Sequence, residues 1–130
     1  MVEPSSEHDH VARQIVDSAF AVHTTLGPGL LESVYEQCLT AELRTRNLSV
    51  ERQVALPIVY RNTRIEAGLR MDMVVEGLVV VETKAVETIL PIHEAQLLTY
   101  LKLFGLQLDL LINFNVTLIK NGIRRLVRTY

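Results

Sequence analysis

A second cysteine is missing from the sequence: Cys38 stands alone, which excludes an intramolecular disulfide and a CxxC zinc site. The sequence also lacks an apolar run near the length of about 20 residues that a membrane-spanning helix needs. Its first ten residues, MVEPSSEHDH, are polar and acidic, whereas a secretory signal begins basic and continues apolar. We therefore expect a cytoplasmic protein that has no membrane partner.

An excess of charge of either sign is absent as well. The 13 Lys and Arg residues against 15 Asp and Glu residues give a formal net charge of -2, so the chain does not bind nucleic acid through its overall charge. No repeat, linker or low-complexity tract divides the 130 residues, of which 48% are hydrophobic. We expect a mobile tail over residues 1–10 and a single domain over residues 11–130. Any phosphate-binding surface must then be a local patch.

The spacing of apolar residues predicts the order of helices and strands. Helical spacing predicts helices over residues 11–26, 31–47 and 91–104. Alternating or continuous apolar runs predict strands over residues 50–60, 69–75, 78–84 and 108–114, with a turn at Arg61-Asn62. Asn121-Gly122 predicts a C-terminal hairpin over residues 116–128. The result is an α/β fold in which helices flank a mixed sheet, and a right-handed crossover makes the two strands of the 79–114 segment parallel.

Asp72 and Glu82 lie on the two strands of a predicted hairpin that turns at Glu76-Gly77. A two-residue turn would put their carboxylates on different faces of the sheet, because side chains alternate along a strand. One more residue in the loop, or a bulge, places Asp72 opposite Glu82. This second register is favoured, because the first would bury an unpaired carboxylate at a cost of several kcal/mol. It gathers one apolar face from Leu69, Met71, Met73, Val75, Val79 and Val81.

Lys84 follows Glu82 on the same face of this predicted hairpin. Two facing carboxylates repel each other and need a cation, and Mg²⁺ prefers the oxygens of carboxylates, carbonyls and water. An ammonium group beside them adds positive charge and can orient an attacking water. The same pattern is also typical of a solvated strand face with cross-strand ion pairs, so these residues alone leave two interpretations.

A second motif lies upstream, where GLLESVY between Gly29 and Tyr35 reads GxxExxY. With this motif, Asp72 and the triplet Glu82-Thr83-Lys84, the chain resembles the GxxExxY proteins of the PD-(D/E)XK nuclease superfamily over residues 11–128. The resemblance implies a restriction-endonuclease-like α-β-β-β-α-β core and a nuclease that hydrolyses phosphodiester bonds with Mg²⁺ or Mn²⁺. It favours DNA over RNA as the substrate. Tyr35 itself is expected in the core with its hydroxyl bonded, not in catalysis.

The resemblance also implies roles for individual side chains. Asp72, Glu82 and Glu32 would be catalytic acids and metal ligands, and Lys84 would assist the attacking water. Thr83 would bind the metal through its backbone carbonyl, while its side chain is expected on the opposite face of the sheet. Glu32 has a second interpretation, because a carboxylate in the first turn of a helix is stabilised by the helix dipole in any protein.

Two further groups are candidates for contact with nucleic acid. Gln96 and Tyr100 match a QxxxY pair of the superfamily's exonuclease-like branch, and their spacing places both on one helical face, beside the site or the DNA. Their alternative role is to cap the edge of the sheet. A late basic cluster is a candidate for binding phosphate backbones, and equally a solvated face. This cluster consists of Lys120, Arg124, Arg125 and Arg128.

The sequence has no helix-turn-helix, zinc finger or aromatic stacking platform, so we expect recognition of backbone or shape and not of base sequence. It has no separate substrate-recognition domain either, which is consistent with a homodimer or with one part of a larger assembly. A catalytically inactive module that binds nucleic acid or protein on the same fold is the alternative function.

Overall fold

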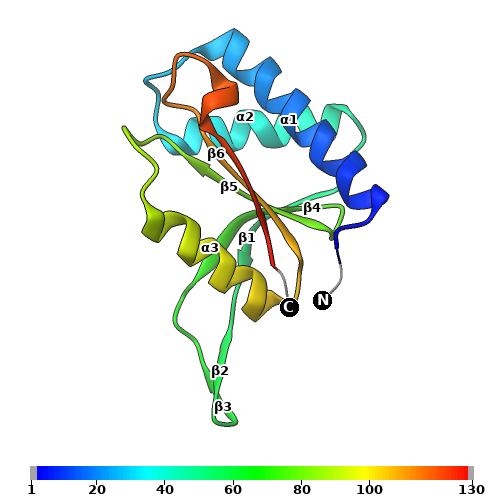
Figure 1. The fold of residues 1–130 in the computed structure, drawn as a ribbon, viewed down its shortest axis with the longest axis vertical. Helices are drawn as coiled ribbons and strands as arrows, with labels where there is room; N and C mark the ends of the chain where they lie inside the picture. The colour runs from blue at the N-terminus through cyan, green and yellow to red at the C-terminus, as the bar shows by residue number, and fades with distance from the viewer. Residues whose placement is uncertain (1–2, 129–130) are drawn as a thin grey trace.

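The structure, a computed structural model, describes residues 3–128 (Figure 1). The outermost residues of the expected tail and domain, 1–2 and 129–130, lie outside this range. The described elements are α1 (Ser6–Leu26), α2 (Glu32–Thr45), β1 (Val50–Ala55), β2 (Ile58–Tyr60), β3 (Thr63–Ile65), β4 (Arg70–Val75), β5 (Val79–Lys84), α3 (Pro91–Phe104), β6 (Leu108–Asn113), the 3-10 helix η1 (Ile119–Gly122) and β7 (Ile123–Val127).

Five strands form one mixed sheet in the order β1-β4-β5-β6-β7. Only β5 and β6 are parallel, which confirms the crossover that the sequence predicts through α3. Helices α1 and α2 cover one face of the sheet, and α3 covers the other (Figure 1). The predicted arrangement, a mixed sheet flanked by helices, is confirmed. No helix within residues 3–128 combines the length and apolar character needed to cross a bilayer.

The first helix begins earlier than the apolar spacing indicates. Ser5 caps it, because its hydroxyl accepts a hydrogen bond from the backbone N–H of His8, and the ring of His8 in turn accepts from the backbone N–H of Ser5. Residues 6–10, expected in a mobile tail, are therefore the first turns of α1. This polar start carries no apolar stripe, so periodicity alone does not reveal it.

The prediction of a C-terminal hairpin over residues 116–128 is wrong. Asn121 and Gly122 lie in η1, and β7 pairs with β6 instead of with the segment just before it. Gly122 approaches the sheet so closely that a Cβ atom there would lie 2.1 Å from the carbonyl oxygen of Asn113. The preceding segment is held against α1, where a ring nitrogen of His23 lies 2.7 Å from the carbonyl oxygen of Val116.

Tyr35, in the first turn of α2, points into the core, as the sequence predicts. Its side chain is fully buried, and its ring stacks on Phe114 with 4.6 Å between centroids. Its hydroxyl donates a hydrogen bond of 2.6 Å to the carbonyl oxygen of Gly27 and accepts one from the backbone N–H of Leu30. The tyrosine of the GxxExxY motif therefore fastens the glycine turn onto the start of α2.

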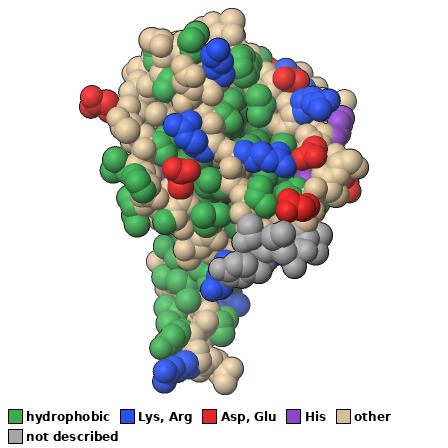
Figure 2. All heavy atoms as spheres, viewed as in Figure 1, with side chains coloured by type: hydrophobic (Ala, Val, Ile, Leu, Met, Phe, Trp, Pro, Cys, Tyr) green, Lys and Arg blue, Asp and Glu red, His purple; other side chains and the backbone are tan. Residues whose placement is uncertain are grey.

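The strand predicted over residues 50–60 is interrupted at Leu56 and Pro57. Leu56 is buried and donates its backbone N–H to the carbonyl oxygen of Leu69. Beyond this point β2 and β3 form a separate two-stranded sheet, joined by the predicted turn at Arg61-Asn62, where both residues have positive φ. We call residues 58–65 the arm, because they project away from the body of the molecule (Figures 1 and 2).

Candidate active site

The β4–β5 hairpin has the register that burial of its apolar side chains predicts. Val75 pairs with Val79 and Met73 pairs with Val81, so three residues lie in the loop. Glu76 and Gly77 in this loop both have positive φ, which glycine adopts without steric cost. The register confirms that Asp72 and Glu82 face each other beyond the last paired residues.

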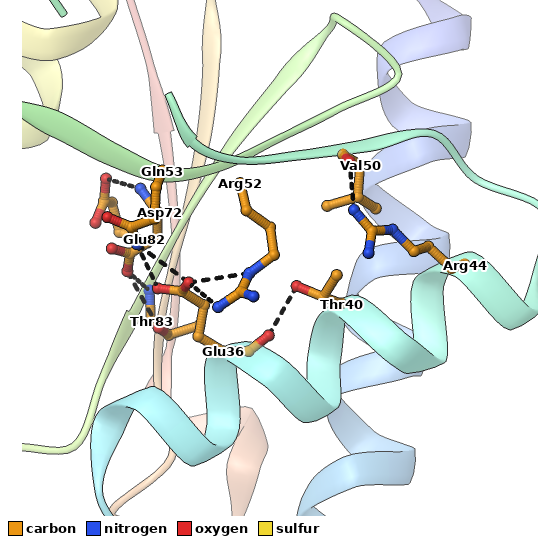
Figure 3. Close-up of polar contacts among 9 residues, drawn as sticks. All are labelled: Glu36, Thr40, Arg44, Val50, Arg52, Gln53, Asp72, Glu82 and Thr83. Atoms are coloured by element: carbon orange, nitrogen blue, oxygen red, sulfur yellow. Dashed lines mark hydrogen bonds and ion pairs between the residues drawn. The ribbon is translucent and has the colours of Figure 1, made fainter. Parts of the chain in front are cut away.

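Each of these two carboxylates accepts a backbone hydrogen bond from the other strand (Figure 3). Oε1 of Glu82 accepts from the N–H of Asp72 at 3.1 Å, and Oδ2 of Asp72 accepts from the N–H of Thr83 at 2.9 Å. Side-chain oxygens thus replace the carbonyl oxygens of a regular ladder at the point where β4 and β5 separate. The acidic pair lies at this open end of the hairpin.

The hydroxyl of Thr83 also donates to Oδ2 of Asp72, at 3.1 Å. The prediction that this side chain lies away from the acidic pair is therefore wrong. The strict alternation behind it does not hold where the two strands part, because Met73 and Val81 are the last paired residues before the carboxylates. Thr83 is fully buried, so its hydroxyl supports Asp72 from within the protein.

A distortion of β1 lies directly opposite Asp72. Gln53 has a φ of 51°, and it is the one position skipped in the β1–β4 pairing between Arg52 and Val54. The side chains before and after Asp72 lie on opposite faces of the sheet. Met73 packs with the α1–α2 core, whereas Met71 packs with residues beneath α3. The sequence predicts both methionines on one face, and the structure corrects this. The twist turns Asp72 toward the end of β5.

Burial and the neighbouring carboxylate of Asp72 raise the pKa of Glu82 from 4.5 to about 9. Only 6% of the Glu82 residue surface is exposed, so water does little to stabilise its charge. Glu82 therefore carries a proton at neutral pH unless a cation takes that proton's place. Two ionised carboxylates this close together in a buried site repel each other, and a bound metal ion would remove this repulsion.

Glu32 is the first residue of α2 and lies within electrostatic reach of Asp72 and Lys84. Burial raises its pKa, the positive charge of Lys84 lowers it, and the negative charge of Asp72 raises it again. Lys84 ends β5 and makes no ion pair with the residues that the structure describes. Three acidic side chains and one lysine therefore share one electrostatic environment.

Tyr100 is half-buried where α3 packs on the sheet, and the exposed Gln96 lies one helical turn before it. The side-chain amide of Gln96 donates to the Tyr100 hydroxyl at 3.1 Å. Burial, followed by the negative charge of Glu82, raises the pKa of Tyr100. The hydroxyl is thus close enough to Glu82 to respond to its charge.

The four basic residues near the C-terminus do not form one patch. Arg124 pairs across the sheet with Leu111, which lies beneath α3, whereas Arg125 pairs with Leu110 on the α1 side and forms an ion pair with Asp9. The others are separate: Lys120 lies in η1, and the guanidinium of Arg128 donates to the carbonyl oxygen of Leu106. Alternation along β7 splits the predicted cluster between two faces.

Sequence reasoning missed a polar network, centred on the buried Glu36, that joins α2 to β1 (Figure 3). Glu36, one helical turn after Glu32, accepts two hydrogen bonds from the guanidinium of Arg52, the shorter at 2.7 Å. The side-chain amide of Gln53 donates to both carboxylate oxygens of Glu36, at 3.0 and 3.1 Å. These contacts fix the helix that carries Glu32 against the distorted strand opposite Asp72. The only sequence signal was the spacing of four residues between the two glutamates.

A second missed residue, Asp109, lies fully buried on β6 beneath α3. Neither of its carboxylate oxygens has a hydrogen-bond partner in the described part of the chain. Burial, and then the charge of Asp72, raises the pKa of Asp109 well above its usual value. An aspartate within the apolar run LDLLIN gives no sign in the sequence that it is buried.

The donor groups fit a hard divalent cation, although they are not preassembled around one. Within residues 3–128 no three His, Cys, Asp or Glu side chains lie close enough to hold one ion together. Asp72 and Glu82 each use one carboxylate oxygen on a backbone N–H, and a side-chain hydrogen bond links the two carboxyl groups. A cation at this pair would take the place of the proton in that bond. Carboxylate oxygen is the donor that Mg²⁺ and Mn²⁺ prefer.

A mixed sheet flanked by helices, with acidic residues on adjacent central strands, is the restriction-endonuclease-like arrangement. A family model described as the PD-(D/E)XK nuclease superfamily matches residues 9–126. The match covers most of the chain, so the chain belongs to the PD-(D/E)XK nuclease superfamily. Comparison with curated proteins and with solved structures gives no match.

Proposed function

We propose that this protein is a divalent-metal-dependent nuclease of the GxxExxY type that hydrolyses phosphodiester bonds, with DNA as the favoured substrate. The observation that carries the proposal is the pairing of Asp72 with Glu82 at the open end of the hairpin. Each accepts a backbone hydrogen bond from the other's strand, and the charge of Asp72 raises the pKa of Glu82. Superfamily membership supplies the class of reaction.

In the proposed mechanism Asp72, Glu82, Glu32 and the backbone carbonyl of Thr83 hold Mg²⁺ or Mn²⁺. The bound ion would supply Lewis-acid stabilisation to the negative charge that develops on the phosphate. Glu82 would hold the ion in its ionised form, because metal ligands must be deprotonated. The hydroxyl and backbone N–H of Thr83 both donate to Oδ2 of Asp72, so Thr83 would hold this carboxylate in place at the ion site.

Lys84 is the proposed partner of the attacking water. It ends β5 two residues after Glu82 and is half-buried, so its ammonium group is held beside the acids and not dispersed in solvent. Its charge already lowers the pKa of Glu32, which supports a position close to the ion site. There it would orient the water and offset the charge on the phosphate.

The test is cleavage of linear DNA, circular DNA and RNA by purified protein in the presence of Mg²⁺ or Mn²⁺. Asp72→Asn and Lys84→Ala should each reduce the rate by about 10²-fold or more, the loss typical when a charge-stabilising group is removed. Glu87→Gln and Lys102→Ala are matched controls, because both positions are exposed. The controls should retain the wild-type rate.

Equal cleavage by wild type and both site variants would overturn the proposal, since the activity would then come from another site or a contaminant. Salt-dependent binding of nucleic acid without cleavage by any divalent metal would identify the alternative, a non-catalytic binding module.

A further inference from the structure

The arm is the least packed part of the described chain. Its strands β2 and β3 belong to a sheet of their own, and every residue from 59 to 68 is exposed. Figure 2 shows it as a narrow projection below the body, with hydrophobic side chains along its length and basic side chains both at its tip and near the body. An isolated two-stranded hairpin is marginally stable in water, so such an arm gains stability from a partner.

The arm and its base are basic, in contrast to the whole chain. Residues 58–70 contain three arginines, Arg61, Arg64 and Arg70, against one acidic residue, Glu66, whereas the formal net charge of the whole chain is -2. Arg64 pairs with Glu66, and the guanidinium of Arg61 lies 5.4 Å from the centre of the Tyr60 ring. An arginine and an aromatic ring exposed together suit phosphate and base contacts.

The arm is continuous with the strands that carry the acidic pair. It is inserted between β1 and β4, whose last pairs before the arm are Val54 with Met71 and Ala55 with Arg70. Asp72 therefore lies two residues from the base of the arm, and the distorted Gln53 lies opposite it. The arm is therefore close enough in the chain to contact a nucleic acid that extends beyond a phosphate at Asp72.

We propose that the arm grips the phosphate backbone of the nucleic acid whose scissile phosphate lies at Asp72. This inference rests on the proposed function and extends it to a substrate longer than the few nucleotides at the acidic pair. A two-stranded ribbon fits the major groove of B-DNA, and arginines on it neutralise phosphates without reading the base sequence. Tyr60 provides a surface on which a base can stack.

The experiment compares binding of a 5′-fluorescein duplex of about 30 base pairs, which spans about three helical turns. All proteins carry Asp72→Asn, so that cleavage does not interfere. The arm variant is Arg61→Ala/Arg64→Ala. The control is Arg13→Ala/Arg46→Ala, which removes the same charge and, like the arm variant, breaks one surface ion pair.

Fluorescence anisotropy at several salt concentrations gives the affinity and its salt dependence. The arm variant should bind at least about 10-fold more weakly at low salt, and its log–log salt slope should fall by about 2, since each phosphate that is no longer neutralised lowers the slope by about 0.9. The control should stay close to the parent protein. A circular dichroism spectrum and melting temperature unchanged from the parent would show that the sheet is intact.

An arm variant with the parent's affinity and salt slope would overturn the arm proposal alone. Absence of binding by the parent protein, together with absence of cleavage by the wild-type protein, would overturn the proposed function as well. A third result assigns the arm to protein contact: the parent is a dimer, Val59→Ser/Tyr60→Ser makes it a monomer, and DNA affinity does not change. These two side chains are 65% and 60% exposed, so their replacement leaves the core untouched.

Discussion

Replacement of Glu82 by glutamine should stabilise the metal-free protein, and the gain should grow with pH. Glutamine has nearly the same shape, and its carbonyl oxygen can still accept the backbone N–H of Asp72. It has no proton to lose. The change therefore removes the titration of one buried group and leaves the packing of β5 in place.

The size of the effect follows from the raised pKa. Glu82 has a pKa of about 9 in the folded protein, against 4.5 as the unperturbed value. Its contribution to stability is fully present below pH 4.5 and is lost as the pH rises toward 9, because the unfolded chain releases the proton first. The loss is at most about 1.4 kcal/mol for each pH unit. From about pH 5 to pH 8 the variant should gain up to about 4 kcal/mol over the wild type.

The assay is urea unfolding of both proteins between about pH 5 and pH 8 in a buffer that contains a chelator. Subtracting the unfolding free energy of the wild type from that of the variant at each pH removes the contribution of the titratable groups that both proteins share. Glu87→Gln, at an exposed position, is the control and should show no such trend. A difference in unfolding free energy between Glu82→Gln and wild type that stays flat across this range would refute the raised pKa and the acidic pair that explains it.

Three other substitutions test the surroundings of the site. Asp109→Asn should stabilise the protein increasingly as the pH rises, because it removes an unpartnered buried acid whose pKa is raised; urea unfolding at about pH 5 and pH 8 measures this, and a loss of stability at both would contradict it. Glu36→Ala should cost about 1–2 kcal/mol, because Arg52 and Gln53 lose the carboxylate to which both donate while water can still reach their exposed side chains; a melting temperature equal to wild type would contradict this. Tyr35→Phe should cost about 1–3 kcal/mol, since the carbonyl oxygen of Gly27 loses its hydroxyl donor; urea unfolding at neutral pH tests this, and an unchanged midpoint would refute it.

The register of the acidic hairpin followed from the sequence because only one pairing keeps a carboxylate out of the apolar face. This preference needs no knowledge of the rest of the molecule, and it correctly pairs Val75 with Val79. The same preference is wrong for Met71, which it places on the same face as Met73 although the two side chains lie on opposite faces. The distortion at Gln53 lies on a strand about 20 residues away in sequence and depends on contacts with Glu36, so no local pattern reports it.

The remaining differences have the same origin in tertiary contacts. Asn121-Gly122 is a good hairpin signal, yet Gly122 is needed for its close approach to the carbonyl oxygen of Asn113, which the sequence does not reveal. Asp109 is buried by α3, whose position over β6 becomes known only with the complete fold. Sequence reasoning therefore identified the elements and the acidic pair, whereas side chains that depend on two elements meeting were missed.

A cation site at the acidic pair is the central feature of the proposed function. Calorimetric titration of the protein with MnCl₂ and MgCl₂ at neutral pH should reveal one saturable site in wild type. Binding should release a proton from Glu82, so the measured heat should depend on the ionisation enthalpy of the buffer. The site should be absent in Asp72→Asn and intact in Glu87→Gln. Equal binding by Asp72→Asn and wild type, or no binding by wild type at millimolar metal, would contradict the proposed metal centre.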